Sequence, residues 1–311
     1  MAQVNMQQVK ELRDRTQAGL NDCRSALVEA EGDMDKAVEI ILKKGLAKSA
    51  KRAGAVASEG VVMTRMAADG LSGVIVEVNI QTDFAARNPD FLAFAEGVAE
   101  TASKADSGAD LGALPFQGGK ATVEDTRAAL VGKLGENITV RRWDRLALDA
   151  PGQVHSYVHL GGKIGVLLAV KAAAAPVVKH ESFKKFIDDT AMQVAAMNPL
   201  FLNGAAVPED DKQKQRELFA GQLAEEGKVP EAKRPQVIEG KVAKWLKEVC
   251  LVEQPSVLET DKSVDQLRQE VAKAAGGDVT LLKFVRFECG EGIEKPQGED
   301  FADEVAKMAK G

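Results

Sequence analysis

The sequence predicts an α+β protein with a three-helix N-terminal domain, a duplicated α+β core and a helical hairpin inserted into the second copy of that core. Apolar residues recur at three- and four-residue steps through the first 45 positions, which is the spacing of one helical face. The chain also aligns with itself at two constant offsets, of 92 and 141 residues. The 49 residues by which these offsets differ fall in a polar stretch with helical periodicity.

Residues 1–54 are predicted to form the N-terminal domain and a linker. Gly32 and Asp33 supply a helix end followed by an N-cap, and Gly45 is expected to end the third helix. Helices this short are marginal alone, so they should pack as one body, whose pattern resembles a ubiquitin-associated domain. The stretch 48–60 is expected to be a linker, with helix allowed at its start, that lets this body move. The three apolar faces comprise Met6, Val9 and Leu12; Cys23, Ala26, Leu27 and Ala30; and Met34, Ala37, Val38, Ile41 and Leu42.

Two copies of one unit are predicted, at 55–150 and at 151–202 with 256–290. The apolar stretch 73–78 matches 165–170 at the offset of 92, and Thr122 matches Ser263 at the offset of 141. Each copy is expected to contain a β-hairpin, a helix, a second helix and a last strand. The hairpin turns are placed at 68–70 and 160–162, where glycine tolerates positive φ.

The insertion, 203–255, is predicted to be an antiparallel helical hairpin with helices at 210–226 and 235–249. Two interpretations are open, because a projecting hairpin can contact another chain, including a second copy, or can be only a solvated projection. The last 21 residues, 291–311, are expected to form a C-terminal helical module that either docks on a partner or packs on the protein. The apolar face of the hairpin comprises Leu218, Phe219, Leu223, Ile238, Val242, Trp245, Leu246 and Val249, and that of the module Phe301, Val305 and Met308.

The composition is that of a soluble globular protein, with 45% apolar and 28% charged residues in a chain of 311. No run approaches the roughly 18 apolar residues that a membrane span needs, and the N-terminus lacks the features of a signal peptide, so a cytoplasmic location is expected. Three cysteines far apart in sequence argue against a disulfide framework or a zinc site. The net charge of −6 argues against broad nucleic-acid binding, and the basic run at 43–52 is expected to be solvated surface.

The sequence lacks the motifs of common enzyme chemistry. The nearest approach to a phosphate-binding loop, residues 161–165, is placed in a hairpin turn rather than before a helix. His155 and His159 are predicted to lie on a strand, at a spacing too long for one metal ion. No combination of nucleophile and base is evident, so a binding protein without cofactor or metal is favoured over an enzyme.

An acidic and an aromatic residue, Asp83 and Phe84, lie where a predicted strand ends. The stretch 73–78 has a buried-strand pattern, and Asn88 and Pro89 predict the start of the next helix, so 82–87 is expected to be a connecting loop. Phe84 is then a candidate anchor for a pocket on a partner. The alternative, favoured by these residues taken alone, is that Phe84 covers the protein's own core.

Several motifs, in order along the chain, resemble those of the bacterial elongation factor Ts family. They are 9–16 (VKELRDRT) with Asp22-Cys23 and 31–33 (EGD), 81–84 (QTDF), 135–138 (GENI) with Arg141-Arg142, and 286–295 (RFECGEGIEK). The resemblance covers nearly the whole chain. It implies a guanine-nucleotide exchange factor, not an enzyme that makes or breaks bonds, whose partner is elongation factor Tu in its GDP-bound and nucleotide-free forms. Direct binding of nucleotide, nucleic acid or membrane is not expected.

The resemblance also implies which residues contact the partner. Thr82, Asp83, Phe84 and Ala85 would enter the GTPase domain of elongation factor Tu and dislodge its magnesium. The other contacts carried over are Arg13, Leu20, Asn21, Gln81, Leu134, Gly135 and His159. Simpler structural roles are open for three of these, because Leu134 can belong to the core, Gly135 can be only a helix C-cap and His159 an ordinary strand residue. The rival functions are an adaptor that uses the core as a scaffold and a metabolic enzyme with an unrecognised site.

Overall fold

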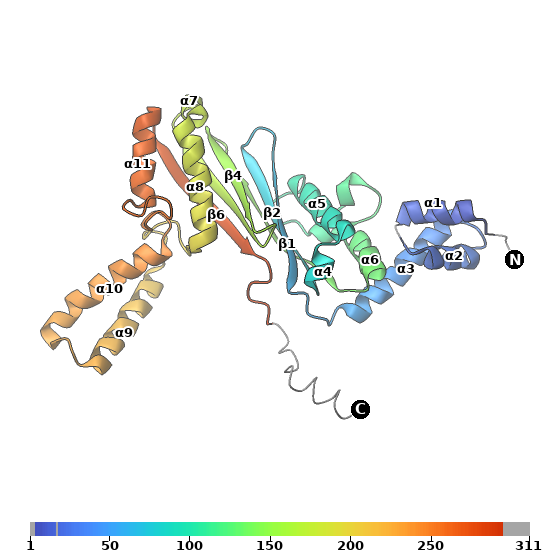
Figure 1. The fold of residues 1–311 in the computed structure, drawn as a ribbon, viewed down its shortest axis with the longest axis horizontal. Helices are drawn as coiled ribbons and strands as arrows, with labels where there is room; N and C mark the ends of the chain where they lie inside the picture. The colour runs from blue at the N-terminus through green and yellow to red at the C-terminus, as the bar shows by residue number, and fades with distance from the viewer. Residues whose placement is uncertain (1–3, 17, 295–311) are drawn as a thin grey trace.

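The computed structural model describes residues 4–16 and 18–294 of the chain (Figure 1). Over these residues it contains eleven α-helices and six β-strands, so the predicted mixture of α and β structure is confirmed. The expected C-terminal module, 291–311, lies outside the described residues from position 295 onward. Among the described residues, no helix combines the length and apolar composition that crossing a membrane requires.

Two three-stranded antiparallel sheets form the centre of the molecule. The first has the order β1 (Glu59–Met66), β2 (Ser72–Ile80), β3 (Ile138–Ala147), and the second β4 (Gly152–His159), β5 (Ile164–Ala172), β6 (Val279–Glu288). Their facing sides share one apolar cluster that includes Val62, Ile75, Leu167 and Phe287. Because both faces of each central strand are covered, β2 and β5 are almost continuously apolar, which explains their pattern in the sequence.

Helices cover the outer face of each sheet, giving a helix–sheet–sheet–helix arrangement (Figure 1). On the first sheet these are α5 (Pro89–Ser103) and α6 (Val123–Leu134), joined through the short 3₁₀ segments η1 (Leu111–Ala113) and η2 (Phe116–Gly118). On the second sheet they are α8 (Glu181–Met197) and α11 (Val264–Ala275), with α7 (Ala175–Lys179) before α8. The aromatic side chains of Phe91 and Phe183, both fully buried, occupy corresponding places in the two outer cores.

The two halves of the core repeat each other in detail. β2 and β5 are separated by the offset of 92, and each breaks its pairing register at the same place, after Glu77 and after Ala169. Thr122 and Ser263 each form a capping box at the start of the second helix. The helices then end at Gly135 and Gly276, both left-handed with φ of 76° and 71°. The two sequence offsets therefore join equivalent elements, whereas the domain boundaries given above stay a prediction.

The N-terminal helices are α1 (Met6–Thr16), α2 (Leu20–Glu29) and α3 (Met34–Arg52). Asp33 caps α3 as predicted, with its carboxylate accepting from the backbone of Asp35 and Lys36. The prediction that Gly45 ends the third helix is wrong, because α3 continues to Arg52. Gly45 instead lies against α6, where an added Cβ would come within 3.3 Å of the Ala128 carbonyl oxygen. The glycine permits close helix packing, and the linker is reduced to a few residues before β1.

The insertion forms a helical hairpin that projects from the body (Figure 1). It consists of α9 (Glu209–Glu226) and α10 (Arg234–Val249), joined through η3 (Glu231–Lys233). Leu223 and Val242 are buried between the two helices, as expected. Leu218 is not part of the seam: its side chain is 54% exposed, since it lies about 100° around the helix from Phe219.

Candidate functional site

The segment after β2 is one turn of helix rather than the expected loop. This turn, α4 (Asp83–Ala86), has Thr82 as its N-cap, and the threonine hydroxyl accepts a hydrogen bond from Ala85 N at 3.2 Å. Residues 82–87 are called the Phe84 turn below. Asn88 then caps α5 in the same way, by accepting from Asp90 N at 2.9 Å. Two caps in succession fix the path of the chain between β2 and α5.

Phe84 points away from the protein. Its side chain is 84% exposed, whereas Ala86 is 7% exposed and Ala85 packs against the first outer core. The single helical turn therefore uses its two alanines to attach itself and directs the phenylalanine outward. The interpretation that Phe84 covers the protein's own core is wrong. A large apolar side chain that an ordered turn holds in solvent is available to a pocket on a partner.

A glutamate from the end of α6 holds the Phe84 turn in place. The Glu136 carboxylate accepts two hydrogen bonds from Thr82, one from its backbone N at 3.1 Å and one from its hydroxyl at 2.8 Å. This bidentate contact fixes both the backbone and the capping side chain of the turn. Glu136 belongs to the motif at 135–138, but nothing in the sequence alone indicates this role. Its position depends on the left-handed Gly135, which turns the chain at the end of α6.

Two further contacts connect the same elements on either side. Gln81 Oε1 accepts a hydrogen bond from Asn137 N at 2.6 Å, and the Asn137 side chain donates to the Ala55 carbonyl at 2.8 Å. At the start of α5, Asp90 forms an ion pair of 2.7 Å with Lys133 of α6. The Phe84 turn is thus held from both ends by the last residues of α6 and those that follow.

Asp83 lies beside Phe84 with its carboxylate accessible. Its nearest charged partner is Arg87, at 3.5 Å between Oδ2 and Nη2, and both side chains are more than half exposed. An exposed pair of this kind contributes little to stability and can be exchanged for another partner at small cost. Asp83 is therefore available to a polar group on an approaching surface.

The other predicted contact residues lie on three elements. Arg13, Leu20 and Asn21 are exposed on α1 and α2, and Leu20 is 45% exposed. Leu134 is half-buried against the first outer core and Gly135 is a C-cap, so the simpler roles considered for both are present in the structure. Both also lie next to Glu136.

His159 ends β4, with Nδ1 2.9 Å from the Tyr157 hydroxyl and the two rings stacked. The turn that follows it lies at the same end of the sheets as the Phe84 turn. Lys163, just after that turn, forms an ion pair of 2.7 Å with Glu59, whose backbone is paired with Ile80. His155 instead contacts Asp188 at 3.1 Å. Across 4–16 and 18–294 no group of three or more metal-ligating side chains occurs.

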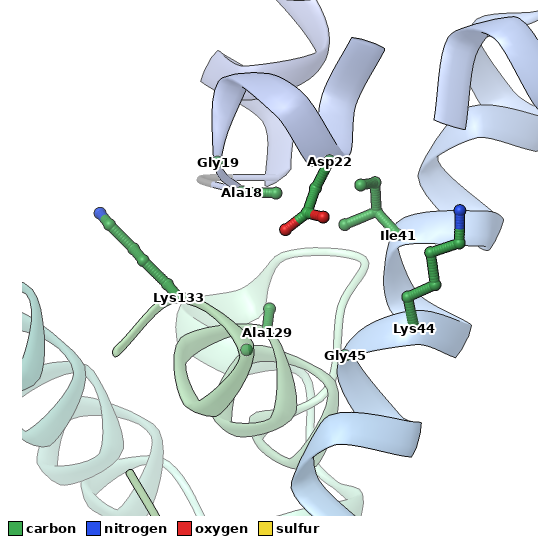
Figure 2. A pocket seen from close by; sticks show the side chains of 9 residues that line it. Ala18, Gly19, Asp22, Ile41, Lys44, Gly45, Ala129 and Lys133 are labelled. Atoms are coloured by element: carbon green, nitrogen blue, oxygen red, sulfur yellow. The ribbon is translucent and has the colours of Figure 1, made fainter. Parts of the chain in front are cut away.

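A small cavity lies where the N-terminal helices pack against α6. Figure 2 shows the Asp22 carboxylate pointing into it, opposite Ala129 of α6 and beside Ile41 and Lys44 of α3. Its volume is about 20 Å³, which is room for about one water molecule. The N-terminal helices are therefore seated closely on the helix whose last turn carries Leu134 and leads to Glu136.

Comparison with known proteins decides which family this site belongs to. A family model described as elongation factor TS matches residues 81–291, two thirds of the chain. The chain belongs to the elongation factor Ts family. Curated proteins named elongation factor Ts are similar over almost their whole length: one from Clostridium perfringens (strain SM101 / Type A) is 45% identical over 307 residues, 98% of this chain and 99% of the relative. One from Nitratiruptor sp. is 44% identical over 309 residues, 99% of each.

The match to the elongation factor Ts model begins at Gln81, the residue that opens the site. It ends at Glu291, beside a second, buried network that sequence analysis did not find. There the fully buried Glu77 carboxylate accepts hydrogen bonds from Arg141 at 3.0 Å, Arg142 at 2.5 Å and the backbone N of Gly290 at 2.8 Å. Burial opposes ionisation of Glu77, but these hydrogen bonds outweigh it and hold the pKa below its ordinary value.

The Glu77 network joins the two sheets at the point where the chain leaves β6. Arg142 lies over the Phe287 ring, with 4.3 Å to the ring centroid, and also donates to the Glu288 carbonyl at 3.1 Å. Arg141 donates to the carbonyl of Glu291 at 2.5 Å. Parts of two motifs that the sequence analysis quoted separately, at 141–142 and 286–295, are therefore one structural unit.

Proposed function

We propose that this protein is a guanine-nucleotide exchange factor for elongation factor Tu, acting in the cytoplasm during translation elongation. The observation that carries the proposal is an 84% exposed Phe84 on a turn that the rest of the protein holds in place. The names of the curated relatives, elongation factor Ts, support the assignment. No bond is made or broken, so the protein acts by binding alone.

In this mechanism the Phe84 turn enters the GTPase domain of the GDP-bound partner. Phe84 acts as an apolar wedge, and Asp83 offers its accessible carboxylate to polar groups beside the wedge. Mg²⁺ requires near-ideal octahedral geometry, so a small displacement of its ligands removes much of its binding free energy. GDP then loses its main counter-charge and dissociates, after which GTP can bind.

Glu136 and Gln81 serve as positioning residues in this proposal. A wedge exerts its effect only if it does not yield when it meets the partner, and the Phe84 turn has only a single helical turn of its own. The two hydrogen bonds from Thr82 to Glu136, and the one from Asn137 to Gln81, attach it to the end of α6. Ordering the turn before binding removes an entropic cost from the encounter.

The remaining family contacts extend the proposed interface. Arg13, Leu20 and Asn21 would bind the partner from the N-terminal helices, and His159 from the end of β4. Leu134 and Gly135 would lie behind the Phe84 turn. The projecting hairpin of α9 and α10 is either a contact to another chain, including a second copy of this one, or a solvated projection. Sedimentation equilibrium of the protein and of its Leu218→Asp variant tests whether a second copy binds there.

Thermodynamic linkage gives the test of the proposed function. If this protein lowers the affinity of elongation factor Tu for GDP, then GDP must lower the affinity of elongation factor Tu for this protein by the same factor. Calorimetric titration of this protein into elongation factor Tu should therefore give tight binding to the nucleotide-free form and much weaker binding in excess GDP and Mg²⁺. Equal affinity in both states would exclude exchange activity and favour the adaptor, while binding of free GDP to this protein alone would favour an enzyme.

A further inference from the structure

The first repeat of the core contains an aromatic plug that lies on the outside of α5. Phe116, in the connection between α5 and α6, stacks on Phe94 with ring centroids 5.7 Å apart and an interplanar angle of 18°. The ring also lies directly on Gly97, where an added Cβ would come within 2.2 Å of Phe116 Cζ. Glycine at position 97 is therefore what admits the ring.

Hydrogen bonds identify the residue of the second repeat that occupies the place of Phe116. In the first repeat Phe116 N donates to the Ala121 carbonyl at 2.9 Å. In the second repeat Ser256 N donates to the Lys262 carbonyl at 2.8 Å, and Lys262 is at the offset of 141 from Ala121. Ser256 thus takes the backbone position of Phe116.

The next residue along confirms the equivalence. Gln117 N donates to the Thr101 hydroxyl at 3.0 Å, and Val257 N donates to the Gln193 side chain at 2.8 Å. Thr101 and Gln193 are related by the offset of 92, on α5 and α8. Both connections therefore pass the first helix of their repeat in the same way, but only the first carries an aromatic side chain there.

The missing ring leaves an open groove between α8 and α11. Its volume is about 270 Å³, and its walls include the apolar side chains of Phe186, Leu267 and Val271, with Ser256 at one side. An apolar cavity of about 150 Å³ is enough to bind benzene, so the groove has room for an aromatic side chain. Asp189, at the offset of 92 from Gly97, stands at the rim.

Acidic groups outnumber basic ones around this groove. Asp189 pairs with Lys185, and Lys262 bridges Glu259 at 3.1 Å and Glu270 at 2.8 Å, so three carboxylates face two ammonium groups. Asp189, Glu259 and Glu270 all line the groove, whereas Lys185 is the one ammonium among its described lining residues. A ligand that adds a positive charge at the rim complements this arrangement.

We propose that the groove between α8 and α11 binds a segment of a partner protein in which an aromatic side chain is followed closely by a basic one. The aromatic ring takes the place in the second repeat that Phe116 takes in the first, and the basic side chain meets the carboxylates at the rim. The groove lies on the outer helices of the second repeat, away from the Phe84 turn (Figure 1). This partner and elongation factor Tu would therefore use separate surfaces.

The plug segment of the first repeat supplies the probe. A labelled peptide with the sequence of residues 113–120 (ALPFQGGK) carries both a phenylalanine and a lysine, and its binding to the full-length protein is followed by fluorescence anisotropy. We expect saturable binding, and binding at least about tenfold weaker for the same peptide with alanine in place of phenylalanine. Absence of saturation up to about 1 mM, or equal binding of the two peptides, would overturn the proposal.

Two protein variants locate the binding. Ser256→Phe combined with Asp189→Gly reproduces the Phe116 and Gly97 pair and should close the groove. The affinity for the phenylalanine peptide should then fall by about tenfold or more. Glu270→Lys reverses one charge at the rim of the groove and should lower the affinity for the peptide severalfold. This surface variant gives a second test if the double variant does not fold. Unchanged affinity in a folded variant of either kind would place the binding elsewhere and contradict the proposal.

Discussion

Replacing Glu136 tests whether the Phe84 turn must be held in order to act. Glu136→Ala removes the acceptor of both hydrogen bonds from Thr82 without touching Phe84 or Asp83. Glu136→Gln keeps one acceptor oxygen and loses the charge. If the protein is an exchange factor, both variants should slow nucleotide exchange, and alanine should slow it more than glutamine.

The expected size of the effect follows from the two lost bonds. A typical hydrogen bond contributes a net stabilisation of about 0.5 to 1.5 kcal/mol. Because this contact is exposed, each of its two bonds is placed in the lower part of that range. The held form of the turn should therefore lose about 1 to 2 kcal/mol relative to other conformations. That corresponds to a loss of about 5- to 30-fold in exchange rate for Glu136→Ala.

The assay is release of a fluorescent GDP analogue from elongation factor Tu, measured for the parent, Glu136→Ala, Phe84→Ala and the double variant. If Glu136 acts by positioning Phe84, its replacement should have little further effect once the phenylalanine is gone. Glu217→Ala on the projecting hairpin is the matched control, because Glu217 contacts Gln213 on its own helix. Full activity of Glu136→Ala, or effects that simply multiply in the double variant, would refute the positioning role.

Four further predictions concern stability and reactivity. Phe84→Ala should leave the melting temperature within about 1 °C of the parent, because the side chain is 84% exposed and makes few contacts within the protein. Gly45→Val should destabilise the protein by about 1 to 3 kcal/mol in denaturant unfolding, because its Cβ would press on a backbone carbonyl of α6. Glu77→Gln should lower the free energy of unfolding at pH 7 by about 1.5 to 3 kcal/mol, the usual contribution of a hydrogen bond to a charged group. Because folding depresses the pKa of Glu77, this stabilisation is present above about pH 4.5 and is lost as the pH falls further, so the stability gap between parent and variant should narrow in acid. Burial raises the pKa of Cys250 and Cys289 to about 11, so alkylation at pH 8 should be about a hundredfold slower in the native protein than after unfolding.

Each of these has a clear contrary result. A large fall in the melting temperature of Phe84→Ala would mean that the side chain packs on the protein. Unchanged stability of Gly45→Val would mean that α3 and α6 do not meet closely. A stability gap for Glu77→Gln that is constant from pH 7 to pH 3 would show that the ionised form is not what the arginines stabilise. Rapid native alkylation would show that the two thiols are accessible.

The mixture of α and β structure could be predicted from the sequence because its helices and turns carry local signals. Capping residues such as Thr122 and Ser263, and left-handed glycines such as Gly135, act within a few residues of their own position, so they can be found without knowledge of the tertiary structure. A constant spacing between two such sets of residues then indicates that the helices whose ends they mark are equivalent. The length of the insertion follows from the same spacing.

The errors arose where packing overrides a local signal. Glycine is common at the end of a helix, but Gly45 lies within α3, where α6 packs closely against it. Phenylalanine is usually a core residue, and only the packing of Ala85 and Ala86 against the core shows that the turn directs Phe84 outward. Leu218 shares an apolar pattern with its neighbours but faces solvent.

The supporting residues of the site were beyond sequence reasoning for a different reason. Glu136 is 54 positions from Thr82, and Glu77 is 213 positions from Gly290. No periodicity links residues so far apart. Glu136 looks like an ordinary surface residue, and Glu77 is a charged residue within an apolar strand whose partners the sequence does not identify. Only the fold brings the end of α6 to the Phe84 turn and the last strand to the Glu77 carboxylate.

The exchange function and the role of Phe84 are tested most directly by the rate of GDP release from elongation factor Tu, in excess GDP, with catalytic amounts of this protein or of Phe84→Ala. We expect strong acceleration by the parent and loss of most of it in a variant whose circular dichroism and melting temperature match those of the parent. Equal acceleration by both proteins would remove the wedge role from Phe84. No acceleration by the parent would contradict the exchange function itself.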